Sequence, residues 1–181
     1  MDLLRSGRAR MEFERFTALE ADPLLRSAYL MAGDRGEAED LVQECLLRLA
    51  RKWPRVRSME HPAAYARRVL FNLILDGGRQ RARRRTELLA SHTTEEHGSA
   101  DQTTAVQEHV ELVQALGGLP ARQRAVLVLR YFVDLPASEV ALILGCSPGT
   151  VKSSASRALE RLREALDPAA PLSTADDISP R

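Results

Sequence analysis

Cationic and hydroxyl side chains near the C-terminal end of the chain recur on one face of an expected helix. The set is Thr150, Lys152, Ser153, Ser156 and Arg157. Lysine and arginine neutralise phosphates or bond guanine edges, and serine and threonine hydroxyls bond phosphates or bases. These residue types in this pattern are typical of a helix that binds DNA. Ser147, just before them, is a further candidate DNA contact.

The segment that must position these side chains, residues 137–157, reads ASEVALILGCSPGTVKSSASR and has the spacing of a helix-turn-helix. A small residue lets two helices touch, a glycine permits the sharp turn, and an apolar residue holds the second helix on the first. These residues are Ala141, Gly145 and Val151. Ser147 is the predicted N-cap, with Pro148 at the first helical position. The predicted buried stripe of the second helix is Val151, Ala155, Ala158, Leu159, Leu162 and Leu166.

A second polar stripe lies on a helix that is expected to begin at Pro62. Its members are Tyr65, Arg68, Asn72, Asp76 and Arg79, followed directly by Arg81, Arg83, Arg84 and Arg85. An aromatic ring beside guanidinium groups and an amide is what binding of unstacked single-stranded bases requires. Gly77 and Gly78 are predicted to interrupt this helix, since each costs about 1 kcal/mol relative to alanine. A solvated basic helix end is the alternative interpretation.

The rest of the chain also has helical periodicity, with apolar residues at intervals of three and four and no long period-two alternation. Helices are expected around residues 13–19 and 24–31, the second closed by Gly33. Asp34 is expected to cap a third helix, whose other side is mostly acidic. The predicted buried stripe of this third helix is Ala38, Leu41, Val42, Cys45 and Leu49. The fold class predicted is all-α.

Charge is unevenly distributed, although 26 basic and 25 acidic residues nearly balance over the 181 residues. Residues 1–90 carry 18 basic and 13 acidic side chains, whereas residues 91–111 carry five acidic and no basic ones. The pattern predicts two small helical domains joined by a flexible acidic linker. The expected bounds are domains at 8–88 and 106–167, a linker at 89–105 and a disordered tail at 168–181.

Several function classes are disfavoured by what the sequence lacks. It has no apolar run near 18 residues and no signal-peptide pattern. We therefore expect a cytoplasmic protein without a membrane span. Cys45 and Cys146 are expected to be buried reduced thiols. No phosphate-binding loop, paired-carboxylate metal site or nucleophile with a histidine partner is evident. We therefore expect neither an enzyme nor a metal site or cofactor.

Three blocks of the chain, taken together, resemble a known family. They are GEAEDLVQECLLRLARKW at 36–53, HPAAYARRVLFNLILDGGRQRARR at 61–84 and the segment 119–166 that contains the helix-turn-helix. In this order and with this gap they are similar to bacterial RNA polymerase sigma factors of the extracytoplasmic-function (ECF) type. The opening FERFTALEADPLLRSAYLMAGD at 13–34 resembles an actinobacterial subgroup.

The resemblance implies a two-domain specificity subunit of RNA polymerase. It assigns core-polymerase binding to Asp40, Gln43 and Glu44 on the third helix. The block at 65–84 would recognise and open the minus-ten element as a single strand, and the helix-turn-helix would read the minus-thirty-five duplex. An anti-sigma factor is a further partner that the resemblance suggests. Tyr65 stands where family members often have tryptophan, a larger ring for stacking.

Two other functions compete with this interpretation. The helix-turn-helix also fits a dimeric transcription regulator that binds operators without core polymerase, although such proteins need symmetric half-sites and usually a sensory domain. The capped start of the second helix is also compatible with an ordinary surface helix of a three-helix bundle that does not bind DNA. An enzyme acting on nucleic acid is disfavoured because no catalytic constellation is evident.

Overall fold

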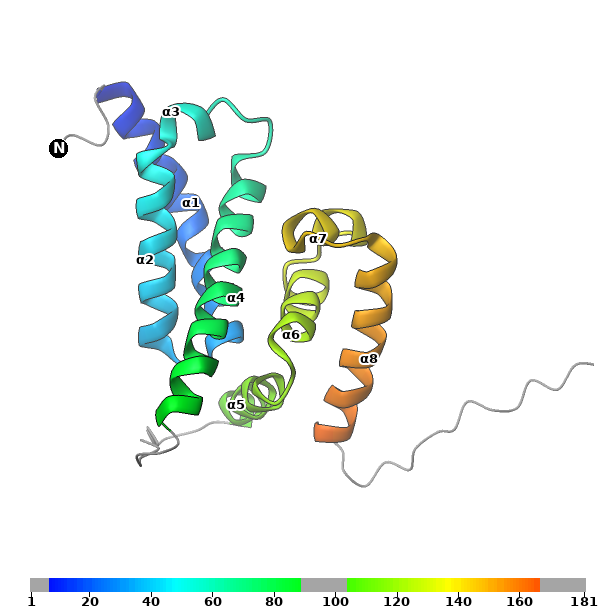
Figure 1. Ribbon diagram of the computed structural model, residues 1–181. Coiled ribbons are helices and arrows are strands. Elements are labelled where there is room, and N and C mark those ends of the chain that lie inside the picture. Colours follow the sequence, from blue (N-terminus) through cyan, green and yellow to red (C-terminus); the bar gives the residue numbers. More distant parts are fainter. Residues whose placement is uncertain (1–6, 89–103, 167–181) are drawn as a thin grey trace, which may run out of the picture.

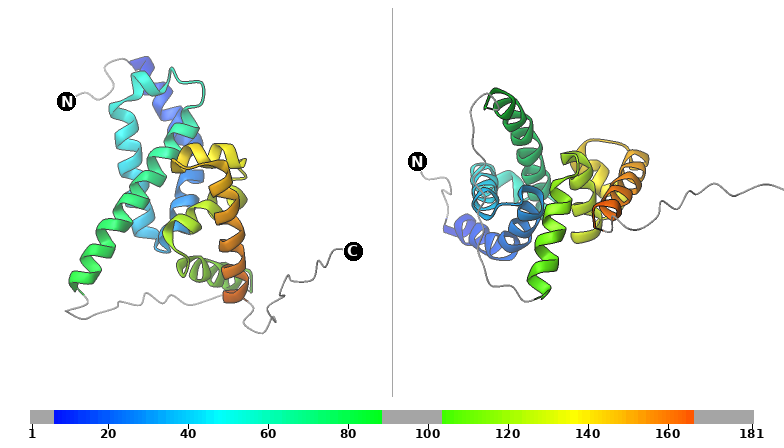
Figure 2. Two further views of the ribbon diagram at one scale, coloured as in Figure 1. Left: turned by 45° about the vertical axis from the view of Figure 1, so that its right-hand side comes forward. Right: turned by 90° about the horizontal axis from the view of Figure 1, so that it is seen from below.

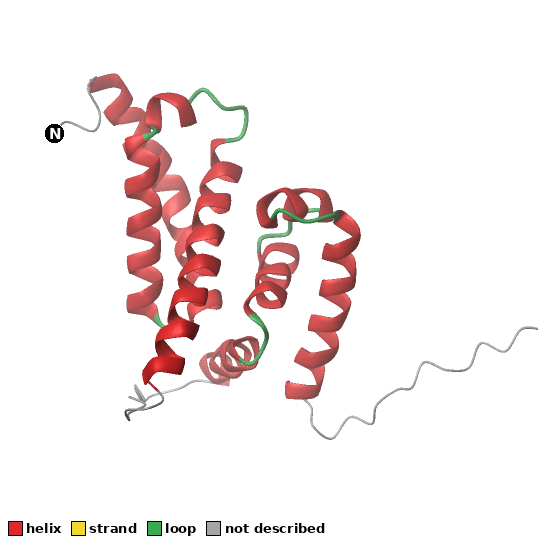
Figure 3. Ribbon diagram, in the orientation of Figure 1, coloured by secondary structure: helices red, strands yellow, loops and turns green. Residues whose placement is uncertain are grey.

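The computed structural model describes residues 7–88 and 104–166, and within these ranges every regular element is helical (Figure 3). The elements are α1 (Gly7–Ala32), α2 (Arg35–Arg51), α3 (Trp53–Val56), α4 (Pro62–Leu88), α5 (Thr104–Gly117), α6 (Ala121–Leu127), η1 (Val128–Phe132), α7 (Ala137–Leu144) and α8 (Pro148–Leu166). The predicted all-α class is confirmed for this part of the chain. None of its helices is long and apolar enough to cross a bilayer.

Helices α1, α2 and α4 pack on one another as an N-terminal bundle (Figure 1). Asp34 caps α2 as predicted, because its Oδ1 accepts a hydrogen bond from the backbone N–H of Glu37 at 2.7 Å. The predicted apolar stripe of α2 is entirely buried. At one end of the bundle, the buried ring of Trp53 in α3 lies 5.1 Å from the rings of both Phe13 and Phe16.

Two expected helices at 13–19 and 24–31 are in fact one, α1, with Pro23 inside it. A proline inside a helix removes one backbone hydrogen bond and crowds the preceding turn. The helix nevertheless continues through Pro23, because Leu24 and Ala28 in the turns that follow are buried in the bundle. Ser27 Oγ also donates to the Pro23 carbonyl at 2.9 Å. Gly33, at φ 77°, ends the helix as predicted.

Helix α4 also differs from the expectation, because it continues from Pro62 to Leu88 through Gly77 and Gly78. The predicted interruption is therefore wrong. Two glycines weaken a helix by about 2 kcal/mol in sum. Burial of the preceding turns, with Leu70 and Phe71 fully enclosed, anchors the helix that extends past them.

The C-terminal unit consists of α5, α6, η1, α7 and α8 (Figure 1). Its core is formed by apolar side chains of all five elements, among them Leu116, Leu127, Leu129, Val140, Val151 and Ala158. Most of the predicted stripe of α8 is buried or half-buried. Leu166, the last residue of α8, is the exception, at 48% exposed.

The two units lie side by side in both views (Figures 1 and 2), with α4 touching α6 and α7, and α1 touching α5, α6 and η1. Arg124 of α6 bridges them by donating to the carbonyl of Met31 at the end of α1. The same guanidinium donates to the carbonyls of Gly117 at 2.7 Å and Leu119 at 3.2 Å. Burial lowers the pKa of Arg124.

Both cysteines are free thiols, as expected. Cys45 is buried, and its Sγ donates to the carbonyl of Ala66 at 3.5 Å. Burial raises the pKa of the Cys45 thiol to about 12, so the reactive thiolate is suppressed. Cys146 is only half-buried, which corrects the expectation that both would be enclosed.

Candidate nucleic-acid interface

The turn between α7 and α8 has the predicted helix-turn-helix geometry. Gly145 adopts a left-handed conformation at φ 63° and ends α7, where a side chain would be strained. Ser147 Oγ accepts a hydrogen bond from the backbone N–H of Thr150 at 3.1 Å, and the two hydroxyls lie 2.9 Å apart. Helix α8 begins at Pro148, and Val151 is fully buried against the unit. The cap fixes the direction in which α8 leaves the turn.

All the predicted contact residues of α8 are exposed: Ser147, Thr150, Lys152, Ser153, Ser156 and Arg157. Neither Lys152 nor Arg157 has an ion pair with any described residue, so both charges are available to a ligand. The hydroxyls of Ser153 and Ser156 donate back to the helix carbonyls of Thr150 and Lys152, each at 3.2 Å. Their oxygens still have lone pairs that can accept from a base amine.

The predicted stripe of α4 is placed on one side of the bundle. Arg68, Asn72 and Asp76 are exposed, whereas Tyr65 is half-buried and packs against the core. Arg79, Arg81, Arg83 and Arg84 also belong to α4, but the structure describes none of their side chains. A half-buried ring next to an exposed guanidinium and an exposed amide can stack a base and bond its edge.

Tyr65 and Arg68 also line a cleft of about 650 Å³ between α4 and α7. The α7 wall of this cleft contributes Glu139, Leu142 and Ile143. This proximity is not predictable from the sequence, since the two walls lie about seventy positions apart and only tertiary packing brings them together. Leu142, at 71% exposed, is a large apolar side chain at the cleft.

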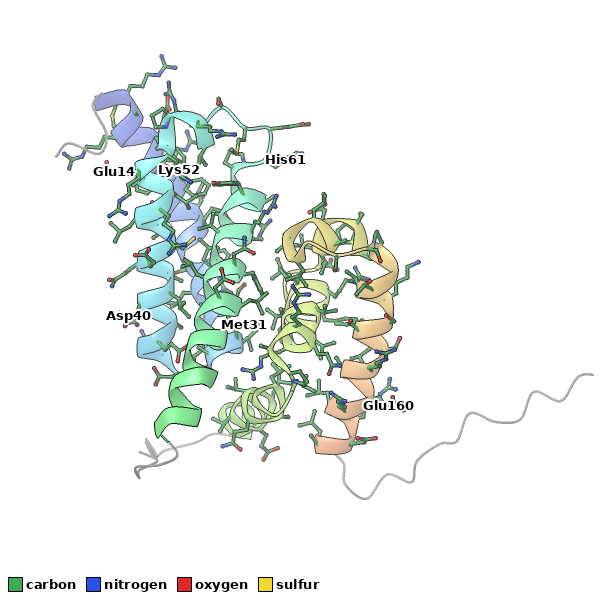
Figure 4. The ribbon with its side chains drawn as sticks, in the orientation of Figure 1. Glu14, Met31, Asp40, Lys52, His61 and Glu160 are labelled. Atoms are coloured by element: carbon green, nitrogen blue, oxygen red, sulfur yellow. The ribbon has the colours of Figure 1, made fainter. Side chains whose placement is uncertain are left out.

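The candidate polymerase-binding residues lie on α2. Asp40 and Gln43 are exposed, and Glu44 is half-buried. Glu44 Oε1 accepts from Arg48 Nε at 2.7 Å, an exposed pair one helical turn apart. Asp40 lies in the first half of α2, and Gln43 and Glu44 lie at its middle, whereas Lys52 is the C-cap; Figure 4 labels Asp40 and Lys52.

Taken together, two helical units with a capped cationic helix on one and an aromatic and basic stripe on the other define a DNA-binding protein. The chain matches the family model "Sigma-70 region 2" over residues 19–85 and the model "Sigma-70, region 4" over residues 109–162. It belongs to the sigma-70 family, in the ECF group of RNA polymerase sigma factors.

Two relatives with similar sequences come from Streptomyces and Mycobacterium. The RNA polymerase sigma-E factor of Streptomyces coelicolor is 36% identical over 159 residues, which span 86% of this chain and 86% of the relative. The ECF RNA polymerase sigma factor SigL of Mycobacterium tuberculosis is 34% identical over 167 residues, which span 87% of this chain and 92% of the relative.

A solved structure has a similar fold. The sigma factor RpoE of Bartonella quintana, in complex with the anti-sigma factor NepR, superposes with a TM-score of 0.68 at 27% identity. The similarity covers 88% of this chain and 99% of that chain.

Proposed function

We propose that this sigma factor engages its promoter through two separate surfaces, one on α4 and one on α8. As a sigma factor, the chain binds core RNA polymerase and directs it to promoters. The exposed face of α8 would read the minus-thirty-five duplex, with Lys152 and Arg157 on phosphates or guanine edges. The observation that supports this most directly is that both cations are exposed and lack an ion pair among the described residues.

On α4, Tyr65 would stack an unpaired base of the minus-ten element, and Arg68 and Asn72 would bond its edge or backbone. Their exposure beside a half-buried ring supports this assignment. Asp40, Gln43 and Glu44 would contact core polymerase from the middle of α2. This assignment is supported by the acidic residues on that face, of which Asp40 is exposed and Glu44 half-buried.

The proposed domain bounds are 8–88 for the core-binding and minus-ten unit and 106–167 for the minus-thirty-five unit. The tether at 89–105 falls almost entirely outside the described residues, as does the tail at 168–181. Joining two weak DNA-binding units makes the second contact effectively intramolecular, so the promoter is bound more tightly than by either unit alone.

An anti-sigma factor is a further proposed partner, by analogy with the RpoE complex. Such a protein would compete with polymerase or DNA for the same surfaces. The proposed role requires no catalytic step by this chain. It places the protein in the cytoplasm, where the polymerase and the chromosome are.

The test is co-purification of the full chain with core RNA polymerase, followed by run-off transcription on genomic promoter fragments. We expect a stable complex and discrete transcripts that core alone does not make. If the chain does not bind core polymerase but binds a palindromic operator as a dimer, it is instead a free-standing regulator.

A further inference from the structure

A narrow cleft separates the C-terminal end of α2 from the N-terminal half of α4. Its volume is about 250 Å³, and its lining residues are Arg48, Arg51, Lys52, Tyr65, Val69 and Asn72. The α2 wall is made of three cations, and the α4 wall of an aromatic ring, an aliphatic side chain and an amide. No acidic side chain lines it.

The positive charge of this cleft is largely uncompensated. Arg48 has an exposed partner in Glu44, but Arg51 and Lys52 have no ion pair with any described residue, and both are exposed. A helix C-terminus favours cations in general, which would explain Arg51 and Lys52 as a local feature of α2. This general preference does not explain why Arg51 and Lys52 lie across the cleft from Tyr65 and Asn72, two candidate base-contacting residues of α4.

The two walls of the cleft are held in place by the bundle core. Leu49 of α2 and Leu70 of α4 are fully buried, and Cys45 Sγ donates to the carbonyl of Ala66 across the helix pair. The spacing of the walls is therefore set by packing before any ligand arrives. A preorganised cationic wall opposite a ring is the arrangement that tracks a nucleic-acid backbone while its bases stack.

We infer that Arg51 and Lys52, with Arg48 beside them, bind backbone phosphates of the separated DNA strand whose bases contact Tyr65 and Asn72. This rests on the proposed role of α4 and extends it to a second helix. Arginine presents a fork of donors that matches phosphate oxygens, and lysine adds a point charge.

Helix α2 then has two functions, one around Asp40 and one at its C-terminal end beside Lys52, both labelled in Figure 4. The first half presents acidic side chains to polymerase, and the last turn presents cations to DNA. A single rigid helix would thus fix the position of the opened strand relative to the enzyme. Neither function is visible from the net charge of α2, because its three basic residues nearly balance its four acidic ones.

The test uses holoenzyme assembled from the full chain and measures promoter opening by permanganate reactivity over a range of KCl concentrations. The double substitution Arg51→Gln and Lys52→Gln keeps unbranched polar side chains of similar helix propensity while removing both charges. We expect the log-log salt slope of opening to fall by about 1.4, since each single-strand phosphate contributes about 0.7. The matched control is Arg15→Gln, an exposed arginine of α1 that also lacks an ion pair with the described residues.

Core binding of each variant is measured in the same preparations by co-elution with polymerase. A double variant that binds core normally but has the salt slope of the Arg15→Gln control overturns the inference and leaves the proposed function intact. A double variant that loses core binding also overturns it, because the cations would then serve polymerase. Wild-type chain that fails to bind core or transcribe refutes the proposed function itself. Arg51→Lys with native Lys52 should keep the wild-type slope, because slope counts charges.

Discussion

Side chains at the start of α8 divide between holding the helix and presenting charge. The Ser147 hydroxyl is bonded to the backbone of Thr150 and satisfies a donor that the helix itself leaves open. The ammonium group of Lys152 has no ion pair with any described residue. The contribution of this side chain to the free energy of unfolding is therefore small. Substitutions at these two positions should therefore change different measured quantities.

Ser147→Ala removes the cap and should lower the free energy of unfolding of the full chain by about 1 kcal/mol, measured in urea. Ser147→Asp restores an acceptor at the N-cap and should restore stability. The same carboxylate places negative charge beside the DNA-binding face, so the holoenzyme should bind its promoter more weakly. Promoter affinity equal to wild type for Ser147→Asp would show that the start of α8 does not approach phosphates.

Lys152→Ala should leave unfolding unchanged within about 0.5 kcal/mol. If the ammonium neutralises one duplex phosphate, the salt slope of promoter binding by holoenzyme falls by about 0.9. Arg163→Ala, an exposed cation in the last turn of the same helix, is the matched control and should keep the wild-type slope. An unchanged slope for Lys152→Ala removes this residue from the interface.

Helix α4 is an element with one enclosed face and one open face. Ala66, Leu70 and Phe71 have no exposed surface, whereas Arg68 and Asn72 point to solvent. Tyr65 lies at the border between the two faces, packed against the core on one side. A ring in that position is held rigid by the bundle while part of it stays available for stacking.

Tyr65→Ala should therefore impair promoter opening more than closed-complex binding. Base–aromatic stacking contributes about 1–3 kcal/mol, so permanganate reactivity of the opened strand should fall about tenfold. Tyr65→Phe keeps the ring and is expected to open the promoter nearly as well as wild type, which separates stacking from the phenol hydroxyl. Equal losses in closed binding and in opening would contradict a melting role for α4.

Elements with local signals were predictable from the sequence, and elements decided by distant packing were not. Asp34 and Ser147 marked the starts of α2 and α8 correctly, because a cap acts within three residues. The grouping of apolar residues suggested two helices where α1 is one, since burial of Leu24 and Ala28 in the bundle outweighs the backbone bond that is lost at Pro23. The exposed face of α8 followed from helical spacing alone, whereas the cleft beside Lys52 depends on how α2 and α4 pack.

At the scale of the whole molecule, the packing of the two units constrains how DNA can be bound. The minus-ten and minus-thirty-five elements lie about 25 base pairs apart, or about 85 Å at about 3.4 Å per base pair. Helix α7 contacts α4, and α8, with 19 residues, is about 28 Å long. If α4 and α8 bind these elements as proposed, the side-by-side arrangement of Figure 2 cannot span both, so we predict that the units separate on the promoter and that Arg124 releases Met31.

Arg124→Met should loosen this arrangement, because it removes the hydrogen bond that joins the end of α1 to α6 while keeping an unbranched apolar stem. We expect longer distances between spin labels on exposed positions of the two units, placed by Arg15→Cys and Arg163→Cys in a Cys146→Ser background. The free energy of unfolding should also fall by about 1–3 kcal/mol, since carbonyl acceptors lose a charged donor.

Arg122→Met is the control for this experiment, because Arg122 is exposed on the same helix and has no hydrogen bond with the described residues. Its label distances should match those of the unsubstituted chain. In holoenzyme on promoter DNA, Arg124→Met and wild type should have the same distances, since the bridge to Met31 is absent from both there. Short distances that survive Arg124→Met in the free chain would mean that the apolar contacts between the units, rather than this guanidinium, hold them together.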